Sequence, residues 1–330
     1  MRASAGHTHA LPPQWKVWSA LAAVYVIWGS TYLAIRVMVR DVPPLLGAGV
    51  RFAVAGAAML AVLRARGVRV RVTRAQLAAA AVVGILLPAG GNGVVTVAER
   101  HVPSGLAALL IASVPLWIAL LRWTAGRERV AGRTIGGLLM GFAGLAVLLV
   151  PGARPADATA VGVVLVLIAA LSWAIGSFSS PRLPLPRDAL VSTAWQMVWG
   201  GAVLLLAAVV AGEPGQVDLG GIGWNSWLAL AYLIVAGSWV AFTCYAWLLQ
   251  NAPMSQVATY AYVNPLVAVV LGWAILGETL SPGMLVGAAL VVASVVVIVS
   301  RESAGREKQP AVARGRKRRS ELLDETRSAA

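Results

Sequence analysis

The chain has 330 residues, of which 59% are apolar and 12% charged, and its formal net charge is +14. An average soluble domain is about 45–50% apolar and about 25% charged, so this composition indicates a membrane protein. It also argues against a nucleic-acid-binding protein, whose Lys and Arg would lie on a soluble face, whereas here they lie between apolar runs. One cysteine and three histidines exclude an internal disulfide and a multi-Cys or His-based metal site, and we expect no cofactor.

Ten apolar runs follow one another along the chain, and each approaches or exceeds the roughly 20 residues that a helix needs to cross a bilayer. The first five are expected at residues 16–37, 44–64, 75–98, 103–122 and 132–150. The second five are expected at residues 159–179, 188–211, 225–250, 254–276 and 281–300. The first run is too long for a cleavable signal core, so it counts as a membrane helix. The predicted fold class is therefore an all-α polytopic membrane protein with ten transmembrane helices.

The basic residues are distributed unevenly between the two sides of this arrangement. If both termini share one side, that side carries most of the 27 Lys and Arg residues, and the other carries only Arg36, Arg40, Arg100 and Arg154. Cytoplasmic loops keep positive charge and translocated loops lose it. We therefore expect a multi-pass protein of the plasma membrane with both termini in the cytoplasm.

The two halves of the chain are related by an internal repeat. Trp28 and Gly56 recur as Trp173 and Gly201 at an offset of 145 residues, and from Pro103 to Val147 the matching residues recur at an offset of 150. The predicted units are a cytoplasmic tail (1–15), two five-helix repeats (16–150 and 151–300), and a basic disordered cytoplasmic tail (301–330). Because five is odd, the second repeat enters the bilayer from the opposite side, as in transporters that work by alternating access.

Several short motifs resemble the EamA-like group of the drug/metabolite transporter superfamily. They are Trp28-Gly29-Ser30-Thr31-Tyr32, Arg51-Phe52, the segment from Pro103 to Pro115, Leu276-Gly277-Glu278, and Gly287. The resemblance implies a multi-pass exporter of amino acids, other metabolites or drugs. It also implies a central cavity built from the helices expected at 16–37, 75–98, 103–122, 159–179, 225–250 and 254–276.

Polar and aromatic side chains inside these apolar helices are the candidates for a substrate cavity, because polar groups facing lipid are costly. The candidates are Trp28, Ser30, Thr31, Tyr32, Asn92, Trp173, Ser177, Tyr260, Tyr262 and Asn264. For the hydroxyl groups the alternative is a hydrogen bond back to their own helix. The glycines around Asn92 are expected to loosen the helix there and to turn its amide toward the cavity.

A second set of residues is expected to act through helix geometry or charge. Pro115 and Pro265 interrupt helical hydrogen bonding and are candidate flexing points or static kinks. Arg51 is the formal charge deepest within an expected helix, and it either neutralises a substrate carboxylate or serves a structural role. Glu128 and Glu278 occupy equivalent turns and are expected to accept from the N-terminal amides of the helices that follow them.

Energy coupling is left open by the sequence, because no Asp or Glu lies near the middle of an expected helix. Glu99 ends the run 75–98 beside Arg100 and His101, where an ordinary interfacial cluster is the expectation and a proton sensor the alternative. Gly-x-x-x-Gly pairs at 137–141 and 283–287 favour close helix contact, within a monomer or across a homodimer.

A small-molecule transporter in the lipid bilayer is therefore the predicted function, and two alternatives remain. A scaffold or sensor would act through the basic tail, where Arg314, Arg316, Lys317, Arg318 and Arg319 could also bind anionic lipids. An intramembrane lipid-modifying enzyme would need an acid/base or metal cluster, which the sequence does not offer, so we expect no catalytic residues.

Overall fold

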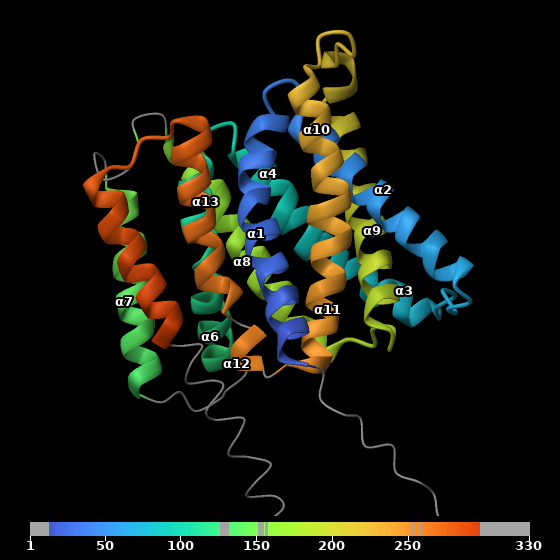
Figure 1. The fold of residues 1–330 in the computed structure, drawn as a ribbon, viewed down its shortest axis with the longest axis horizontal. Helices are drawn as coiled ribbons and strands as arrows, with labels where there is room; N and C mark the ends of the chain where they lie inside the picture. The colour runs from blue at the N-terminus through green and yellow to red at the C-terminus, as the bar shows by residue number, and fades with distance from the viewer. Residues whose placement is uncertain are drawn as a thin grey trace, which may run out of the picture.

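The computed structural model describes residues 13–125, 132–150, 155, 158–252, 254–257 and 259–297. Within these ranges the chain forms helices joined by short connections, and no strand is present. The helices stand side by side in one bundle, so the connections gather at its two ends (Figure 1). We call the end where α1 begins the near end and the end where α1 finishes the far end.

Each half of the chain supplies a similar series of helices. The first contains α1 (Gln14–Met38), α2 (Pro44–Ala65), α3 (Arg74–Gly84) with η1 (Ile85–Gly93) and α4 (Val94–Ala98), α5 (Ser104–Ile111), α6 (Val114–Thr124) and α7 (Gly132–Leu149). The second contains α8 (Ala160–Ser179), η2 (Ser180–Arg182), α9 (Ala189–Val210), η3 (Glu213–Gln216), α10 (Trp224–Tyr232) with η4 (Leu233–Val240) and α11 (Ala241–Asn251), α12 (Met254–Val257) and α13 (Tyr260–Leu276). A further helix spans Pro282–Val297.

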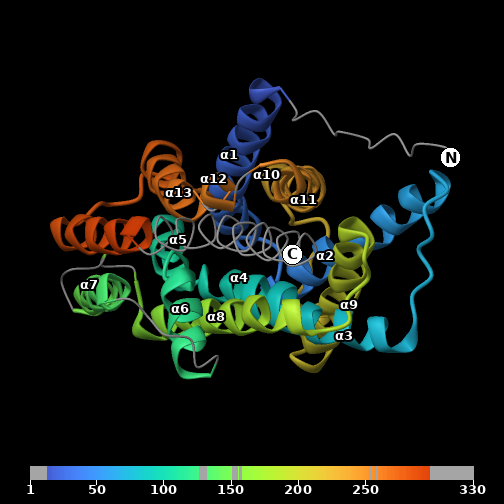
Figure 2. The same ribbon diagram turned by 90° about the horizontal axis from the view of Figure 1, so that it is seen from below.

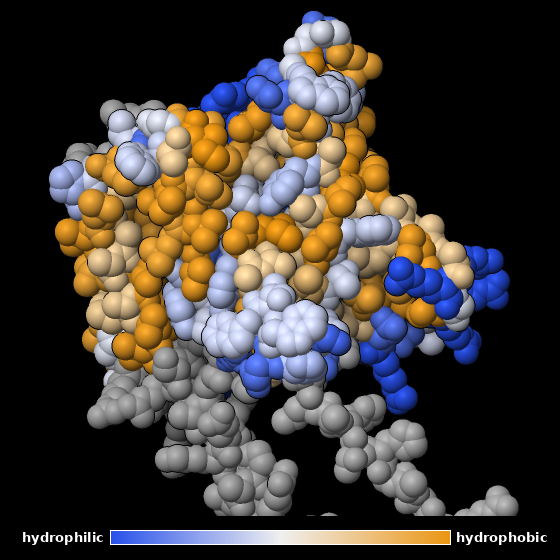
Figure 3. Space-filling model, in the orientation of Figure 1, coloured by the Kyte–Doolittle hydropathy of each residue, from blue (hydrophilic) through white to orange (hydrophobic). Residues whose placement is uncertain are grey.

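Among the described residues, seven helices are long and apolar enough to cross a membrane. Three shorter apolar helices, Ile135–Leu148, Tyr260–Leu276 and Pro282–Val297, bring the spans to the predicted ten. Exposed Val, Leu, Ile and Trp side chains cover the flank of the bundle, and the more hydrophilic residues gather toward its ends (Figure 3). The predicted all-α polytopic fold is confirmed.

The third and eighth spans both contain a π-helical stretch at a corresponding place. Pro88 lies within η1, and because proline has no backbone N–H it cannot donate the hydrogen bond that the helix would use there. Three glycines follow it in η1. In η4, which has no proline, the same wider winding occurs. π-Helical turns are rare and are found frequently at functional sites, so their presence in both repeats makes the third and eighth spans candidates for a functional role.

Two repeat-related glycines let the second and seventh spans cross closely. A Cβ added to Gly56 of α2 would lie 2.8 Å from the carbonyl oxygen of Ala194 in α9. A Cβ added to Gly201 of α9 would lie 2.4 Å from the backbone nitrogen of Ala53 in α2. Any larger residue would push the backbones apart, and α2 and α9 lie side by side in both views (Figures 1 and 2).

The glycine motifs of the fifth and tenth spans take part in contacts within the chain. A Cβ on Gly287 would lie 3.1 Å from the carbonyl oxygen of Gly144, and one on Gly141 would lie 2.6 Å from the Ser294 hydroxyl. These contacts join α7 to the helix Pro282–Val297 at one edge of the bundle, opposite the edge formed by α2 and α9 (Figure 2). Whether the chain also forms a homodimer stays a prediction.

At the far end, acidic side chains join the two repeats through helix N-termini. Asp41, after α1, accepts hydrogen bonds from Gly223 N and Ser226 Oγ at the start of α10. Glu213 accepts from the backbone nitrogens of Leu45 and Leu46 at the start of α2. Carboxylates are favourable there because they meet unpaired N–H groups and the positive end of the helix dipole.

At the near end, the helix caps within the described residues are local. Asp188 accepts from the nitrogens of Leu190 and Val191 in its own helix α9. Thr73 forms a capping box with Gln76 at the start of α3. The two ends of the bundle are therefore held in different ways.

Candidate functional site

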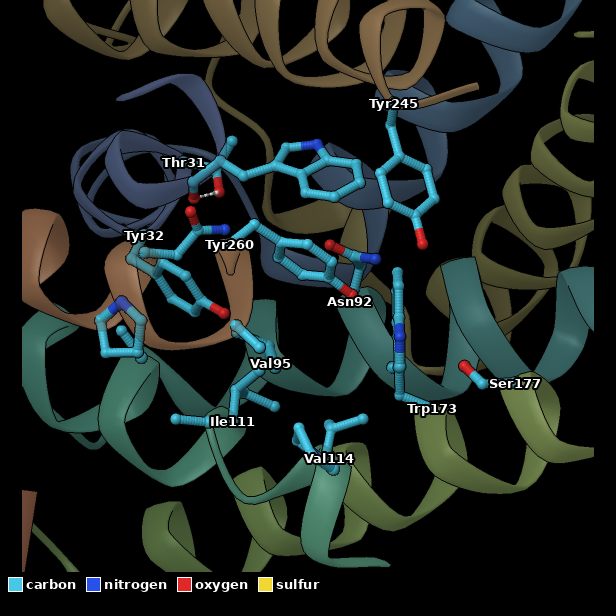
Figure 4. Close-up of a pocket in the computed structure, with 18 of the residues that line it drawn as sticks. Thr31, Tyr32, Asn92, Val95, Ile111, Val114, Trp173, Ser177, Tyr245 and Tyr260 are labelled. Atoms are coloured by element: carbon cyan, nitrogen blue, oxygen red, sulfur yellow. Dashed lines mark hydrogen bonds between the residues drawn. The ribbon is translucent and has the colours of Figure 1, made fainter. Parts of the chain in front are cut away.

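A cavity of about 300 Å³ lies in the middle of the bundle, between the two repeats. Helices of both halves form its wall, and Tyr32, Asn92, Tyr245 and Tyr260 point into it from α1, η1, α11 and α13, with Trp173 of α8 opposite (Figure 4). Protein sites for small molecules begin at about this volume. The spans that the family resemblance implied supply all of its lining residues except Arg51, which belongs to α2.

Aromatic rings make up much of the wall. The indole of Trp28 contacts three rings, with centroids 5.2 Å from Phe242, 5.1 Å from Tyr245 and 5.4 Å from Tyr260. Tyr245 and Tyr260 are themselves 5.6 Å apart and nearly perpendicular. Edge-to-face packing of this kind holds the rings in place, so the wall is rigid and apolar at this corner.

A few polar groups interrupt this apolar wall. Asn264 is a lining residue whose amide oxygen is buried and accepts no hydrogen bond from any described residue. Asn92 enters from η1, where the π-helical winding turns its amide toward the cavity (Figure 4). The Thr31 hydroxyl lies in the wall but donates to the carbonyl oxygen of Trp28 at 2.6 Å.

Arg51 lines the cavity and is also held by neighbouring residues. Its side chain is 3% exposed, its Nε donates to the Ser238 hydroxyl at 3.0 Å, and its guanidinium lies 4.7 Å from the ring centre of Phe52. Ser238 belongs to η4, so Arg51 ties α2 of one repeat to the π-helical stretch of the other. Both roles expected from the sequence are thus compatible with its position.

Two of the candidate residues do not line the cavity. Ser30 hydrogen-bonds to the carbonyl oxygens of Val26 and Ile27 and to the Tyr232 hydroxyl of α10. Tyr262 stands outside the wall, beside Thr259 and Tyr25. The reason is helical geometry, since residues one or two positions apart point in different directions.

The remaining cavity candidates, both prolines and Arg51 lie around the cavity. Trp28, Thr31, Tyr32, Asn92, Trp173, Ser177, Tyr260, Asn264, Pro115, Pro265 and Arg51 are all lining residues. Pro115 is in the first turn of α6, after the break that separates α5 from α6. Pro265 lies inside α13 without ending it. Their role as flexing points stays a prediction.

Glu278 accepts N-terminal amides, but not those of the helix that follows it. Its carboxylate accepts from the nitrogen and hydroxyl of Ser104 at 2.7 Å and from Gly105 N at 2.9 Å, at the start of α5. The expectation of a bond to the next helix is wrong, because that helix begins at Pro282, which has no N–H, and the Ser281 hydroxyl already accepts from Met284 N. Gly277, at φ +66°, turns the chain back toward α5.

Glu128 lies outside the described residues, as do the basic tail 301–330 and most of the tail 1–15.

Glu99 is not part of an interfacial cluster. Arg100 and His101 are exposed, whereas the Glu99 side chain is 0% exposed and points into the bundle at the far end of the cavity. Val95, one turn earlier, lines the cavity. The expectation failed because the sequence does not show toward which side the last turn of a span directs its end residue.

Sequence reasoning also missed several wall residues. Phe242 and Tyr245 of α11 were not among the candidates, although Tyr245 contacts both Trp28 and Tyr260. The spacing of Trp28, Thr31, Tyr32 and Ile35 is the pattern of one helix face, and it would have excluded Ser30. No comparable signal distinguishes Tyr245 from other aromatic residues in an apolar span.

Comparisons with known proteins agree with this architecture. The model of the EamA-like transporter family matches residues 15–150 and again 160–300, once for each repeat. The uncharacterized inner membrane transporter YedA of Escherichia coli (strain K12) is 40% identical over 283 residues, which cover 86% of this chain and 90% of YedA. The uncharacterized transporter YoaV of Bacillus subtilis (strain 168) is 24% identical, over 84% of this chain and 94% of YoaV.

A solved structure of similar fold has a TM-score of 0.58 and 22% sequence identity, and the match covers 85% of this chain and 95% of that one. At this identity the likeness concerns the fold alone. The double family match agrees with the predicted pair of five-helix repeats. This chain therefore belongs to the EamA-like transporter family, and it is a multi-pass membrane transporter.

Proposed function

We propose that this protein exports small amphipathic organic molecules across the plasma membrane by alternating access through the central cavity. The observation that carries this proposal is the cavity itself, whose wall is shared by α1, α5 and α6 of one repeat and α8, α11 and α13 of the other. A site between two pseudo-equivalent halves can open to either side when one half rocks against the other.

The wall chemistry supports an aromatic or apolar substrate body with a neutral or anionic hydrogen-bonding end. Trp28, Trp173 and Tyr260 offer ring faces and edges to an apolar body. Asn92 offers an amide that can donate and accept hydrogen bonds, and Arg51 offers positive charge. The lining residues include no carboxylate, so a cation would find no opposite charge in the described wall.

The charge of one loop supports an orientation of the bundle, and burial at the far end supports a conformation that an exporter uses. The positively charged loop that joins α2 to α3 lies at the near end, which supports a cytoplasmic near end and cytoplasmic termini. Thr96, Glu99 and Ser104 close the far end and are all nearly fully buried. In an exporter, a cavity shut on the outer side is the state that loads substrate from the cytoplasm.

The test is an uptake screen in proteoliposomes with labelled amino acids, nucleosides and cationic drugs, each measured with and without a pH gradient. We expect saturable uptake of one uncharged or anionic aromatic class, and reduced uptake in Asn92→Ala. The matched control is Cys244→Ala, because Cys244 lies on α11 beside Tyr245 but not in the cavity wall.

Equal loss in Asn92→Ala and Cys244→Ala, at equal protein levels, would exclude the cavity as the transport site. Uptake confined to cationic drugs would contradict the assigned substrate chemistry. If no compound in the panel moves although the protein is folded and present in both orientations, the proposal of an exporter of such molecules fails.

A further inference from the structure

Glu99 is buried at the far end of the cavity, and its carboxyl oxygens accept no hydrogen bond from the described residues. It follows α4 and lies between the spans Arg74–Ala98 and Ser104–Thr124. An ionised carboxylate that loses water without gaining hydrogen bonds is costly, so such a group is either protonated or stabilised by nearby cations.

Charged and titratable groups surround this carboxyl from the elements that pack against it. Arg36 of α1 donates a hydrogen bond to the backbone oxygen of Glu99, and Tyr32 of the same helix is also close. Arg51 approaches from α2 and Glu278 from the connection after α13. Helix α8, which also packs against α4, carries no ionisable side chain.

These groups act on the carboxyl in opposite directions. Burial and the Glu278 carboxylate raise the pKa of Glu99 well above its ordinary value, and Arg36 and Arg51 lower it, with a net rise. A group with a raised pKa in one conformation binds a proton more tightly there than in an open, hydrated one. Acid therefore favours the conformation in which the far end is closed.

We propose that the carboxyl of Glu99 is the proton-binding site of this transporter, and that protonation closes the far end of the bundle. A proton enters from the far side while that end is open and converts the carboxylate to the neutral acid. The neutral acid can be buried without charge, so the end closes around it. With the far end shut, the proton leaves through the cavity to the near side, and the ionised form then favours reopening of the far end. This inference rests on the proposed alternating-access function and supplies its energy coupling.

The first test measures opening of the far end without any substrate. In a Cys244→Ala background, a reporter cysteine replaces Ala108, a lining residue that is 1% exposed and lies on α5 near the far end. A membrane-impermeant maleimide is added on the side from which an exposed Gln216→Cys variant is labelled. The Gln216→Cys rate also corrects for the effect of pH on thiol reactivity.

We expect the corrected labelling rate at position 108 to fall severalfold between mildly alkaline and mildly acidic medium. In Glu99→Gln, which resembles the protonated form, the rate should stay low at every pH. Glu99→Asp should keep the pH dependence, and so should Glu213→Gln, which removes another buried far-end carboxylate. A pH dependence that persists unchanged in Glu99→Gln would overturn the proposal.

A second measurement covers the case in which Glu99→Gln does not fold. Infrared difference spectra of the reconstituted protein between the two pH values should show the band of a protonated carboxylic acid, and this band should shift in Glu99→Asp and not in Glu213→Gln. Its absence from wild type would refute the proton site. Neither measurement uses a substrate, so a failed uptake screen and a failed proton site give separate results.

Discussion

Tyr260 and Tyr262 lie two residues apart on α13, yet only Tyr260 borders the cavity. At the residue scale, the identity of a side chain matters less than the direction in which its helix presents it. Tyr260 contacts Trp28 and Tyr245, whereas Tyr262 lies on the side of Thr259 and Tyr25. These two tyrosines therefore form a natural pair for testing the wall.

We predict that Tyr260→Ala lowers initial uptake by about tenfold or more, since a loss of about 1.4 kcal/mol of substrate contact changes an equilibrium tenfold. Tyr262→Ala should leave uptake within about twofold of wild type, because its ring does not line the cavity. Both are measured as initial rates in proteoliposomes at equal protein content. Similar losses in the two variants would place the substrate elsewhere.

Glu278 allows a second prediction at this scale. Glu278→Gln keeps the size of the side chain but removes the charge that accepts from Ser104 and Gly105. Because hydrogen bonds to charged groups contribute about 1.5–3 kcal/mol, we expect the variant to lose stability of that order. The measurement is the thermal midpoint in detergent, with Asp218→Asn, a change at an exposed turn, as the control. An unchanged midpoint would show that the capping contact contributes little.

The membrane spans could be predicted to within a few residues, because about 20 apolar residues in a row have few other uses. The surroundings of the Ser30, Tyr262 and Glu99 side chains could not be predicted from the sequence. Each lies close in sequence to a cavity residue, and only its rotation about the helix axis decides what it contacts. The bond from Glu278 to α5 depends on which helix ends meet, which the order of residues along one chain does not reveal.

At the scale of elements, the contact between α2 and α9 depends on small residues at repeat-related positions. Gly56 and Gly201 correspond at the offset of the internal repeat, and both lie in the contact between α2 and α9. The π-helical stretches η1 and η4 show the same correspondence, although only η1 contains a proline. The winding therefore follows from the architecture of the two halves and not from Pro88 alone.

Gly201→Ala tests this crossing. The added methyl group would lie 2.4 Å from the backbone nitrogen of Ala53, so the helices must separate, and overpacking of this kind costs about 1–3 kcal/mol. We expect a lower thermal midpoint in detergent. Gly136→Ala in α7 is the matched control, because a Cβ there meets nothing within 4 Å and alanine favours a helix. Equal midpoints in the two variants would show that the crossing tolerates a methyl group.

At the scale of the whole molecule, the basic loop between α2 and α3 and the acid-capped helix starts lie at opposite ends of the bundle. In a Cys244→Ala background, we expect an impermeant maleimide to label Gln216→Cys but not Ala65→Cys in intact cells. Both positions are exposed, so access alone decides the result. Labelling of Ala65→Cys alone would reverse the assigned orientation.

Deletion of residues 302–330 tests whether the basic tail takes part in transport. We expect the truncated protein to transport at the wild-type rate, because the cavity and its wall lie within residues 28–265. The measurement is uptake in proteoliposomes with and without anionic lipid. A loss of transport would favour a working role for the tail, which was the alternative drawn from its cluster of arginines.

The acids that join the repeats at the far end also bear on the protein's resting state. If the two halves were identical, a two-fold rotation in the membrane plane would convert the form open to one side into the form open to the other, so the two would be equal in energy and equally populated. Asp41, Glu213 and Glu278 add hydrogen bonds between the repeats at the far end. At the near end, the described caps stay within their own helices. Each 1.4 kcal/mol of difference shifts such a population about tenfold. A duplicated architecture can thus acquire a preferred resting conformation from a few side chains at one end, while its backbone remains nearly symmetric.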